Sequence, residues 1–282
     1  MRVNSLIKKL YEQKGPPFLT VIIVGLFVFE NMFPLRKRKA AMVQRIVING
    51  KTAATSALGF RYFLIPVIVW ASLKSEDGKK GLLQQLAIPY IIKFILGFMG
   101  LDYGNYVWHR LSHSIPLLWR FHQVHHSDLD LDLSTAFRFH IGEILPSALF
   151  RAAIVWLLGV NWKVVLYYEI AFEAANSFHH CNLKLALPLE QNLTDYIVTP
   201  SMHGIHHSIV RNETNSNYSV IFSFWDRIHQ TLKLGIPQEK INIGMPAYRN
   251  TRELGYFNLM TMPFQKQRKW ELPDGEVPRR TF

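Results

Sequence analysis

The sequence predicts an all-α integral membrane protein. About four to five transmembrane helices are expected to support a cytoplasmic helical cap that carries a histidine-rich site for two metal ions. Three observations favour this fold class. The chain is 49% hydrophobic but only 18% charged, whereas soluble domains contain roughly 25% charged residues. Its apolar stretches are close to the ~20 residues that cross about 30 Å of hydrocarbon. Most of its 12 histidines gather in short clusters.

Five apolar stretches are long enough to be considered as transmembrane helices. The expected spans cover residues 16–34, 57–73, 83–101, 144–159 and 162–178. Only Val160 and Asn161 separate the last two spans, so we expect a helical hairpin over about 144–178. The first apolar run begins late and lacks a small-residue cleavage site, so no signal peptide is expected.

Positive charge beside the spans predicts the topology. The loop expected after the first span contains six Lys and Arg residues between 36 and 51, and loops of this kind face the cytoplasm. Counting the expected spans from this loop then places all the histidine clusters on the cytoplasmic side. The chain divides into transmembrane helices over 1–101, a catalytic region over 102–231 that includes the hairpin, and a cytoplasmic extension over 232–282. This organisation suits a bacterial inner membrane or an endoplasmic reticulum.

Charge and cysteine content narrow the classes of partner and cofactor. The excess of Lys and Arg over Asp and Glu is 32 − 20 = +12. Topology and anionic lipid headgroups explain this excess, so no nucleic-acid partner is expected. The only cysteine is Cys181, which excludes an internal disulfide, a CxxC zinc site and a four-thiolate iron–sulfur cluster. Any metal must therefore be held by histidines or carboxylates.

Three histidine motifs carry the chemical signal. HRLSH has the spacing HxxxH, and HQVHH and HGIHH both have the spacing HxxHH. On a helix, residues four apart share a face, so their imidazoles can reach one metal ion or two adjacent ions. The eight motif histidines are His109, His113, His122, His125, His126, His203, His206 and His207. Eight imidazoles exceed the four ligands of one zinc ion and suit two metals with an open position each.

The pattern around these motifs resembles the fatty acid hydroxylase / sterol desaturase superfamily. The resemblance covers about 102–231 and rests on Asp102, Tyr106, HRLSH, Trp119, HQVHHS, TAFRFH, Glu143, HHCN, TPSMHGIHHS and WDR. Members are membrane di-iron oxygenases, so the resemblance implies two Fe ions, O2 as co-substrate, and hydroxylation or desaturation of a lipid. The chain shows no haem or dinucleotide motif, so a ferredoxin, cytochrome b5 or reductase is expected to supply electrons.

The resemblance adds a ninth ligand and leaves several neighbours open. His180 in HHCN matches a family ligand. Asn176, one helical turn earlier, could face the same metal, whereas His179 would point about 100° away. His140 matches a position that the family favours, although a hydrogen-bonded structural role explains it equally well. No catalytic residue is expected beyond the metal ligands.

Helix spacing suggests carboxylates that orient ligands. Asp102 lies two turns before His109, and Glu173 lies two turns before His180. A ligating histidine usually donates its other N–H to a carboxylate or carbonyl, but hydrogen bonding between helices would explain both residues as well. Three alternating aspartates are expected to form a solvated loop face: Asp128, Asp130 and Asp132.

The chain departs from the family pattern after the last ligand motif. Ser219 stands in place of a glycine, and His229 and Gln230 stand in place of Phe and Gly. His229 is interpreted as a tolerated substitution and not as a further ligand. Two other classes of function remain open from the sequence: a zinc-dependent hydrolase and a non-catalytic membrane metal-binding scaffold or transporter.

Overall fold

The computed structural model describes residues 15–280, and every named element in this range is helical. The helices before the hairpin are α2 (Gly15–Met32), α3 (Met42–Gly59), α4 (Ile65–Asp77), α5 (Leu82–Gln85), α6 (Tyr90–Ser114) and α7 (Pro116–His126). The others are α8 (Ile141–Leu158), α9 (Trp162–His180), α10 (Leu187–Thr194), α11 (Pro200–His206), α12 (Arg211–Thr214), α13 (Phe224–Ile228) and α14 (Tyr256–Thr261). Extended pairing within the described range is limited to three isolated bridges.

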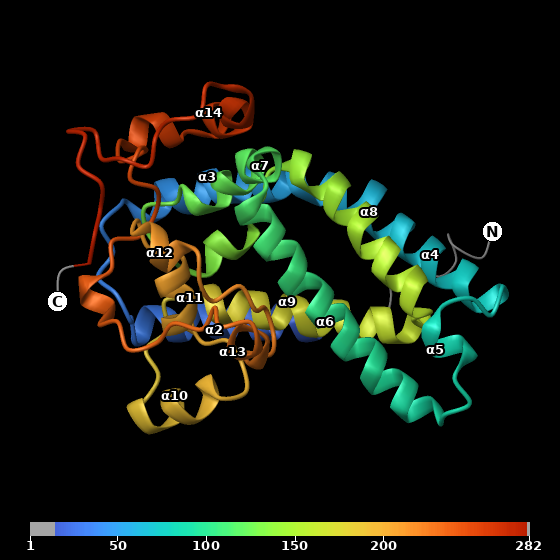
Figure 1. Cartoon of the computed structure of the whole chain (residues 1–282). Helices are drawn as coiled ribbons and strands as arrows, with labels where there is room; N and C mark the ends of the chain where they lie inside the picture. The colour runs from blue at the N-terminus through green and yellow to red at the C-terminus, as the bar shows by residue number, and fades with distance from the viewer. Residues whose placement is uncertain (1–14, 281–282) are drawn as a thin grey trace.

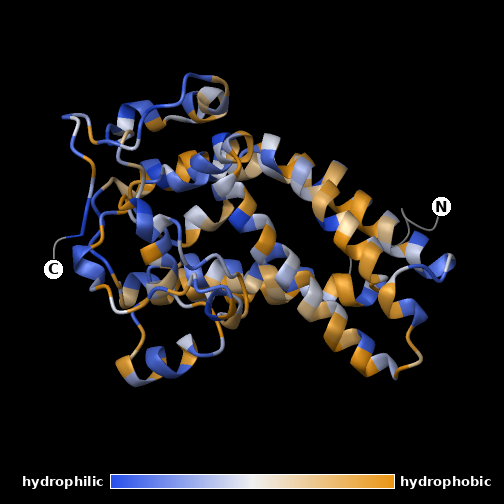
Figure 2. Cartoon of the chain, viewed as in Figure 1, coloured by the Kyte–Doolittle hydropathy of each residue, from blue (hydrophilic) through white to orange (hydrophobic). Residues whose placement is uncertain are grey.

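Apolar and polar parts of the chain lie at opposite ends of the molecule. Figure 1 shows α4, α5 and the first half of α6 at one end, and α10 to α14 at the other. Hydrophobic residues are concentrated along α4, α6 and α8, whereas the loops around α12 and α14 are largely hydrophilic (Figure 2). The long helices therefore form an apolar support for a polar cap.

The second predicted span is part of a longer helix. A π-helical segment, Phe60–Leu64, joins α3 to α4, so helical backbone runs without a break from Met42 to Asp77. The expected beginning at 57 was wrong, as was the expectation of a loop up to residue 51. Arg45 makes this part of the sequence look like a polar loop, but the structure buries its side chain against acidic partners. Hydropathy alone does not detect such a buried ion pair.

The third predicted span is not one helix. Residues 83–101 are divided between α5 and α6, with a non-helical stretch between them that ends at Pro89. Proline disfavours helical backbone in the residue before it and is tolerated at a helix beginning. From Tyr90, α6 continues beyond the expected end at Leu101 to Ser114, and it carries the first histidine motif into the cap.

The last two predicted spans correspond to two helices, α8 and α9, joined by a short turn. Gly159 ends α8 with φ +72°, a left-handed conformation that favours glycine. The side chain of Asn161 then accepts a hydrogen bond of 2.9 Å from the backbone N–H of Lys163 and caps α9. Helix α9 continues beyond the expected end at 178 to His180, so it carries a histidine pair to the polar end.

The main apolar core lies where the long helices meet. Leu64 and Ile68 pack there with Ile144 and Ala148 of α8 and Val164 of α9. Two helical segments, Met42–Gln85 and Ile141–Leu158, are long and apolar enough to cross a membrane, and the apolar helix Pro17–Met32 is shorter. Many large apolar side chains face outward, including Val21, Phe29, Tyr62, Trp70, Ile91, Leu149 and Leu157. Contiguous apolar surface of this kind is typical of a membrane or partner contact, and the number of spans stays a prediction.

Candidate metal centre

Four helices end at the histidine motifs. The first motif lies in the last turns of α6, the second in the last turn of α7, the HH pair at the end of α9, and the third across the end of α11. Each motif keeps its one-turn spacing, so the imidazoles of one helix point in a common direction. The C-terminal end of a helix carries a partial negative charge that favours a cation. The backbone therefore contributes to a cation site as well as positioning its ligands.

The structure brings all nine predicted histidine ligands together in two adjacent sets. Within each set, one possible ligand atom per residue lies within 4.8 Å of all the others. The first histidine set is His109, His113, His122, His126 and His206. The second histidine set is His125, His180, His203 and His207. Neither set contains a carboxylate or the cysteine. The sets adjoin through sequence neighbours and through the stacked rings of His126 and His207, whose centroids are 4.4 Å apart.

The spacing of the ring nitrogens fits a metal ion. In the second set, Nε2 of His180 lies 3.0 Å from Nε2 of His125 and 2.9 Å from Nε2 of His203. Two nitrogens bound at about 2.1 Å to one ion and at right angles would lie about 3.0 Å apart. In the first set, Nε2 of His122 and Nε2 of His206 are buried without a hydrogen-bond partner. Buried polar atoms are rarely left unpaired, so an ion bound by these atoms would remove an energetic cost.

Hydrogen bonds on the opposite ring nitrogen orient four of the ligands. Nδ1 of His122 pairs with the carboxylate of Glu143 at 3.0 Å. Backbone carbonyls accept from Nδ1 of the others: Tyr218 for His109 at 2.8 Å, Ser216 for His206 at 2.7 Å and Asn176 for His180 at 2.8 Å. Each bond fixes the tautomer that leaves Nε2 free for a metal. Sequence reasoning missed the role of Glu143, because its partner belongs to another helix.

The two carboxylates suggested by helix spacing do not orient ligands. Asp102 accepts hydrogen bonds from Nε1 of Trp225 at 2.9 Å and from the backbone N–H of Phe222 at 3.2 Å. It therefore links separate segments of the chain by hydrogen bonds, as the second interpretation of its spacing expected. Glu173 makes no hydrogen bond to His180 or to any other described residue, and it lines a cavity. Two turns of helix separate residues by about 10 Å along the axis. A shared face therefore did not bring either carboxylate close to its histidine.

The remaining histidines and Asn176 lie outside both sets. His140 caps α8, with Nδ1 accepting from the backbone of Gly142 at 2.9 Å, which matches its structural interpretation. The side-chain N–H of Asn176 donates to the carbonyl of Ala136 at 3.0 Å, and Asn176 lines the cavity beside the sets. Nδ1 of His179 is bonded to a backbone carbonyl, although its ring adjoins that of the second-set His203 at 4.2 Å. His229 stacks on an aromatic ring and not on the cluster.

Burial favours the neutral form of most of the cluster imidazoles. Burial and neighbouring imidazoles lower the pKa of His109 to about 3. Burial also lowers the pKa of His180 to about 3. The same causes lower the pKa of six further ligands well below the ordinary 6.5: His113, His125, His126, His203, His206 and His207. Neutral imidazole is the form that binds metals, so these side chains are ready to do so near neutral pH.

The segment after α7 is held by a buried ionic network. The expectation that its aspartates form a solvated face was wrong, because all three are buried. Arg45 donates from Nε to Asp128 at 2.6 Å and also bonds Asp132, while Asp130 accepts from the backbone N–H groups of residues 39 and 40. Burial alone would raise the pKa of Asp128, but Arg45 and Arg138 hold that pKa well below its usual range. The network fastens the second motif to α3.

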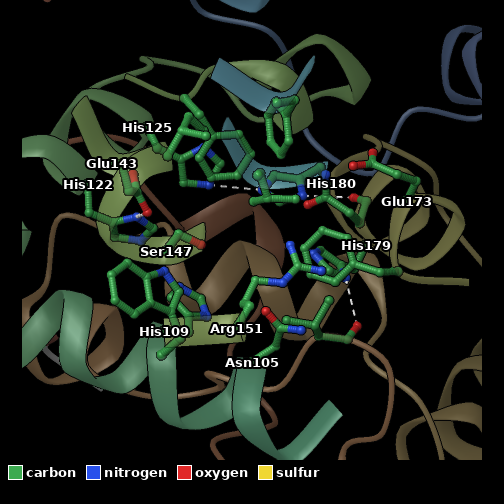
Figure 3. A pocket seen from close by; sticks show the side chains of 18 of the residues that line it. Asn105, His109, His122, His125, Glu143, Ser147, Arg151, Glu173, His179 and His180 are labelled. Atoms are coloured by element: carbon green, nitrogen blue, oxygen red, sulfur yellow. Dashed lines mark hydrogen bonds and ion pairs between the residues drawn. The ribbon is translucent and has the colours of Figure 1, made fainter. Parts of the chain in front are cut away.

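A cavity of about 90 Å³ adjoins both histidine sets. Figure 3 shows His109, His122, His125 and His180 facing this space, with Glu143 behind His122. Its apolar lining comprises Phe60, Leu64, Trp108, Phe139, Ile144, Phe172 and Val220. Its other polar lining comprises Asn105, Ser147, Arg151, Glu173, Asn176, His179, His203 and Ser219. The cavity therefore lies between the apolar helices and the imidazoles.

The two histidine sets lie within a region that matches a known protein family. Residues 94–231 match the model of the family described as fatty acid hydroxylase. This region belongs to that family, so the resemblance predicted from the histidine motifs is confirmed. No solved structure matches the chain.

Several curated proteins are similar to this chain over part of their length. Alkylglycerol monooxygenase of Homo sapiens is 32% identical over 163 residues, which cover 55% of this chain and 34% of that protein. Ornithine lipid hydroxylase OlsE of Rhizobium tropici is 28% identical over 185 residues, which cover 65% of this chain and 54% of that protein. A very-long-chain aldehyde decarbonylase of Oryza sativa subsp. indica is 28% identical over 139 residues, which cover 46% of this chain and 22% of that protein. The chain thus spans about half of these relatives or less.

Proposed function

We propose that this protein is a membrane-bound non-haem di-iron monooxygenase that hydroxylates a lipid. The observation that carries the proposal is the pair of carboxylate-free histidine sets beside a mainly apolar cavity. Imidazole ligands suit iron as well as zinc or copper. The names of the relatives support a lipid substrate, since alkylglycerol monooxygenase and ornithine lipid hydroxylase both act on lipids.

The residues of the chain have separable roles in this reaction. The first histidine set would hold one iron ion and the second set the other. When bound, the ions would supply the activation of O2 for attack on an unactivated C–H bond. Glu143 keeps the ring of His122 in one orientation. The apolar lining of the cavity would exclude water from the imidazoles that face it. Phe172 and Leu64 offer contact surface for an acyl or alkyl chain.

The wider setting follows from the apolar helices and from the chemistry. We propose a multi-pass protein in a bacterial inner membrane or endoplasmic reticulum, with the metal centre facing the cytoplasm. Insertion of one oxygen atom from O2 into a C–H bond releases the other as water and consumes two electrons and two protons. An external ferredoxin, cytochrome b5 or reductase would supply the electrons. Desaturation starts from the same hydrogen abstraction, and product mass distinguishes the two outcomes.

The test combines isotope labelling with one ligand substitution. Cells that express the protein are grown under ¹⁸O2, and their lipids are compared by mass spectrometry with those of cells that express His125→Ala. We expect a labelled hydroxylated lipid with the wild type and its loss with His125→Ala. His229→Phe is the matched control, because His229 lies outside both sets and should tolerate replacement. Product that persists with His125→Ala, or oxygen derived from water, would refute the proposal.

A further inference from the structure

We propose that a basic hollow in the C-terminal segment docks a small acidic one-electron carrier protein. We further propose that Trp270 and Trp119 conduct its electrons to the first histidine set. The inference rests on the proposed function, because the metal centre is the electron acceptor. The hollow encloses about 640 Å³. Its charged lining comprises Arg249, Lys266, Arg268, Lys269, Glu253 and Glu271.

The lining carries more positive than negative charge. Arg268 and Glu253 neutralise each other through hydrogen bonds of 2.9 and 3.0 Å, and they form one wall of the hollow. Lys266 is exposed, and the side chain of Lys269 is 84% exposed. The ammonium of Lys269 is 4.0 Å from Glu271, a solvent-exposed separation that contributes little stability. The surplus positive charge therefore faces solvent, where a carboxylate-rich protein would be attracted and oriented.

A short series of aromatic rings connects this hollow to the metal ligands. Trp270 directly follows Lys269, and its ring centroid is 6.0 Å from that of Trp119. The Trp119 ring is in turn 5.0 Å from His113 and 5.5 Å from His126. Nε1 of Trp270 donates to a backbone carbonyl at 2.8 Å, which fixes the indole. Electron tunnelling falls steeply as the gap between groups widens, so rings in contact provide the favoured path from surface to cluster.

A second series of rings provides an internal comparison. It runs from Tyr103 through His229 and Tyr106 to Tyr218, with centroid separations of 5.7, 4.9 and 6.3 Å. Tyr218 then contacts His109 at 5.6 Å. Its outer residue, Tyr103, is not part of the lining of the basic hollow. Charge therefore favours the tryptophan route for an acidic carrier, and Tyr103 offers a matched control.

The electron balance fixes what the carrier must do. Each docking transfers one electron, so the carrier is oxidised, the metal centre is reduced and neither indole changes its oxidation state. Two such transfers, together with two protons and one O2, account for one hydroxylated carbon and one water. The docked protein must therefore be a reusable one-electron carrier, and it must dissociate between transfers.

Docking is tested on the metal-free protein in detergent, with a plant-type [2Fe–2S] ferredoxin as the probe. The double variant Lys266→Glu/Lys269→Glu should raise the Kd about tenfold at low salt, and the difference should shrink at high salt. Lys184→Glu/Lys240→Glu is the control, because it makes the same charge change at exposed lysines elsewhere. Unchanged ferredoxin binding by the first variant would overturn the proposal. The proposal would also fail if only binding to phosphatidylglycerol vesicles were lost, which would identify a membrane contact.

The route is tested by stopped-flow reduction of the iron-loaded protein at saturating reduced ferredoxin. Trp270→Leu should slow reduction several-fold without changing the Kd, and Trp270→Phe, which preserves packing, should slow it less. Dithionite needs no docking and should reduce every variant at the wild-type rate. Slower reduction by Tyr103→Leu, with Trp270→Leu unaffected, would refute the route. Normal docking and reduction without any oxidised lipid would contradict the proposed function and leave this inference standing.

Discussion

Glu143 gives the sharpest test of how the metal centre is oriented. Its carboxylate is buried and pairs at 3.0 Å with Nδ1 of His122, a ligand of the first histidine set. Loss of such a partner costs about 10- to 100-fold in metal affinity, which is about 1.4 to 2.7 kcal/mol. Glu143→Gln keeps an oxygen that can accept the hydrogen bond but removes its charge, so we expect about a tenfold loss. Glu143→Ala removes both and should approach a hundredfold loss.

The assay is competition for ferrous iron against a chromophoric chelator, with the protein in detergent and without O2. Glu173→Gln is the matched control, because Glu173 lines the same cavity without bonding a cluster histidine. Its affinity should equal that of the wild type. The reasoning fails if Glu143→Ala binds iron as tightly as the wild type. It also fails if Glu173→Gln loses as much affinity as Glu143→Ala, since burial of any carboxylate would then explain the effect.

Three further predictions concern pH, the buried network and the hairpin. Burial holds the pKa of most cluster imidazoles far below 6.5. The affinity for ferrous iron, measured by the chelator competition, should therefore change little between about pH 8 and pH 6. A tenfold fall in that affinity would contradict neutral buried ligands. Arg45→Met removes the guanidinium that pairs with the buried Asp128 and Asp132, which should cost about 3–5 kcal/mol in urea unfolding. A loss below about 1 kcal/mol would show that the network adds little. Gly159→Ala places a Cβ 2.8 Å from the carbonyl oxygen of Lys80 at φ +72°, so it should lower the midpoint of urea unfolding. The control Gly25→Ala meets no atom within 4 Å and should leave that midpoint unchanged or slightly raised. Equal effects of the two substitutions would contradict the strain argument.

The grouping of the candidate metal ligands could be predicted from the sequence because their geometry is local. A one-turn spacing such as that of His109 and His113 is fixed by the helix itself, and the structure places all nine candidates in the two sets. The orienting groups could not be predicted in this way. Glu143 and the carbonyls of Ser216 and Tyr218 reach their imidazoles from other elements, and no periodicity within one segment encodes such contacts.

The fold was predictable where hydropathy and local geometry coincide. The beginnings and ends of α8 and α9 combine apolar runs with a turn that begins at Gly159 and a cap at Asn161. The division between α5 and α6 was also encoded, because Pro89 disfavours helical backbone just before it, but the continuous apolar run obscured that signal. The first half of the long helix from Met42 was not predictable from hydropathy, since the partners that bury Arg45 lie more than eighty residues away.

The absence of carboxylates from both sets has an electrostatic consequence. In the proposed di-iron enzyme, histidine ligands alone would leave the charge of two divalent ions uncompensated, in a site that is largely buried. Four helices end at this site, and each end is equivalent to about half a negative charge, which gives about −2 in all. Glu143 adds one further negative charge through His122. In the proposed enzyme, fixed dipoles and one carboxylate would thus offset much of the charge of the ions without occupying a coordination position.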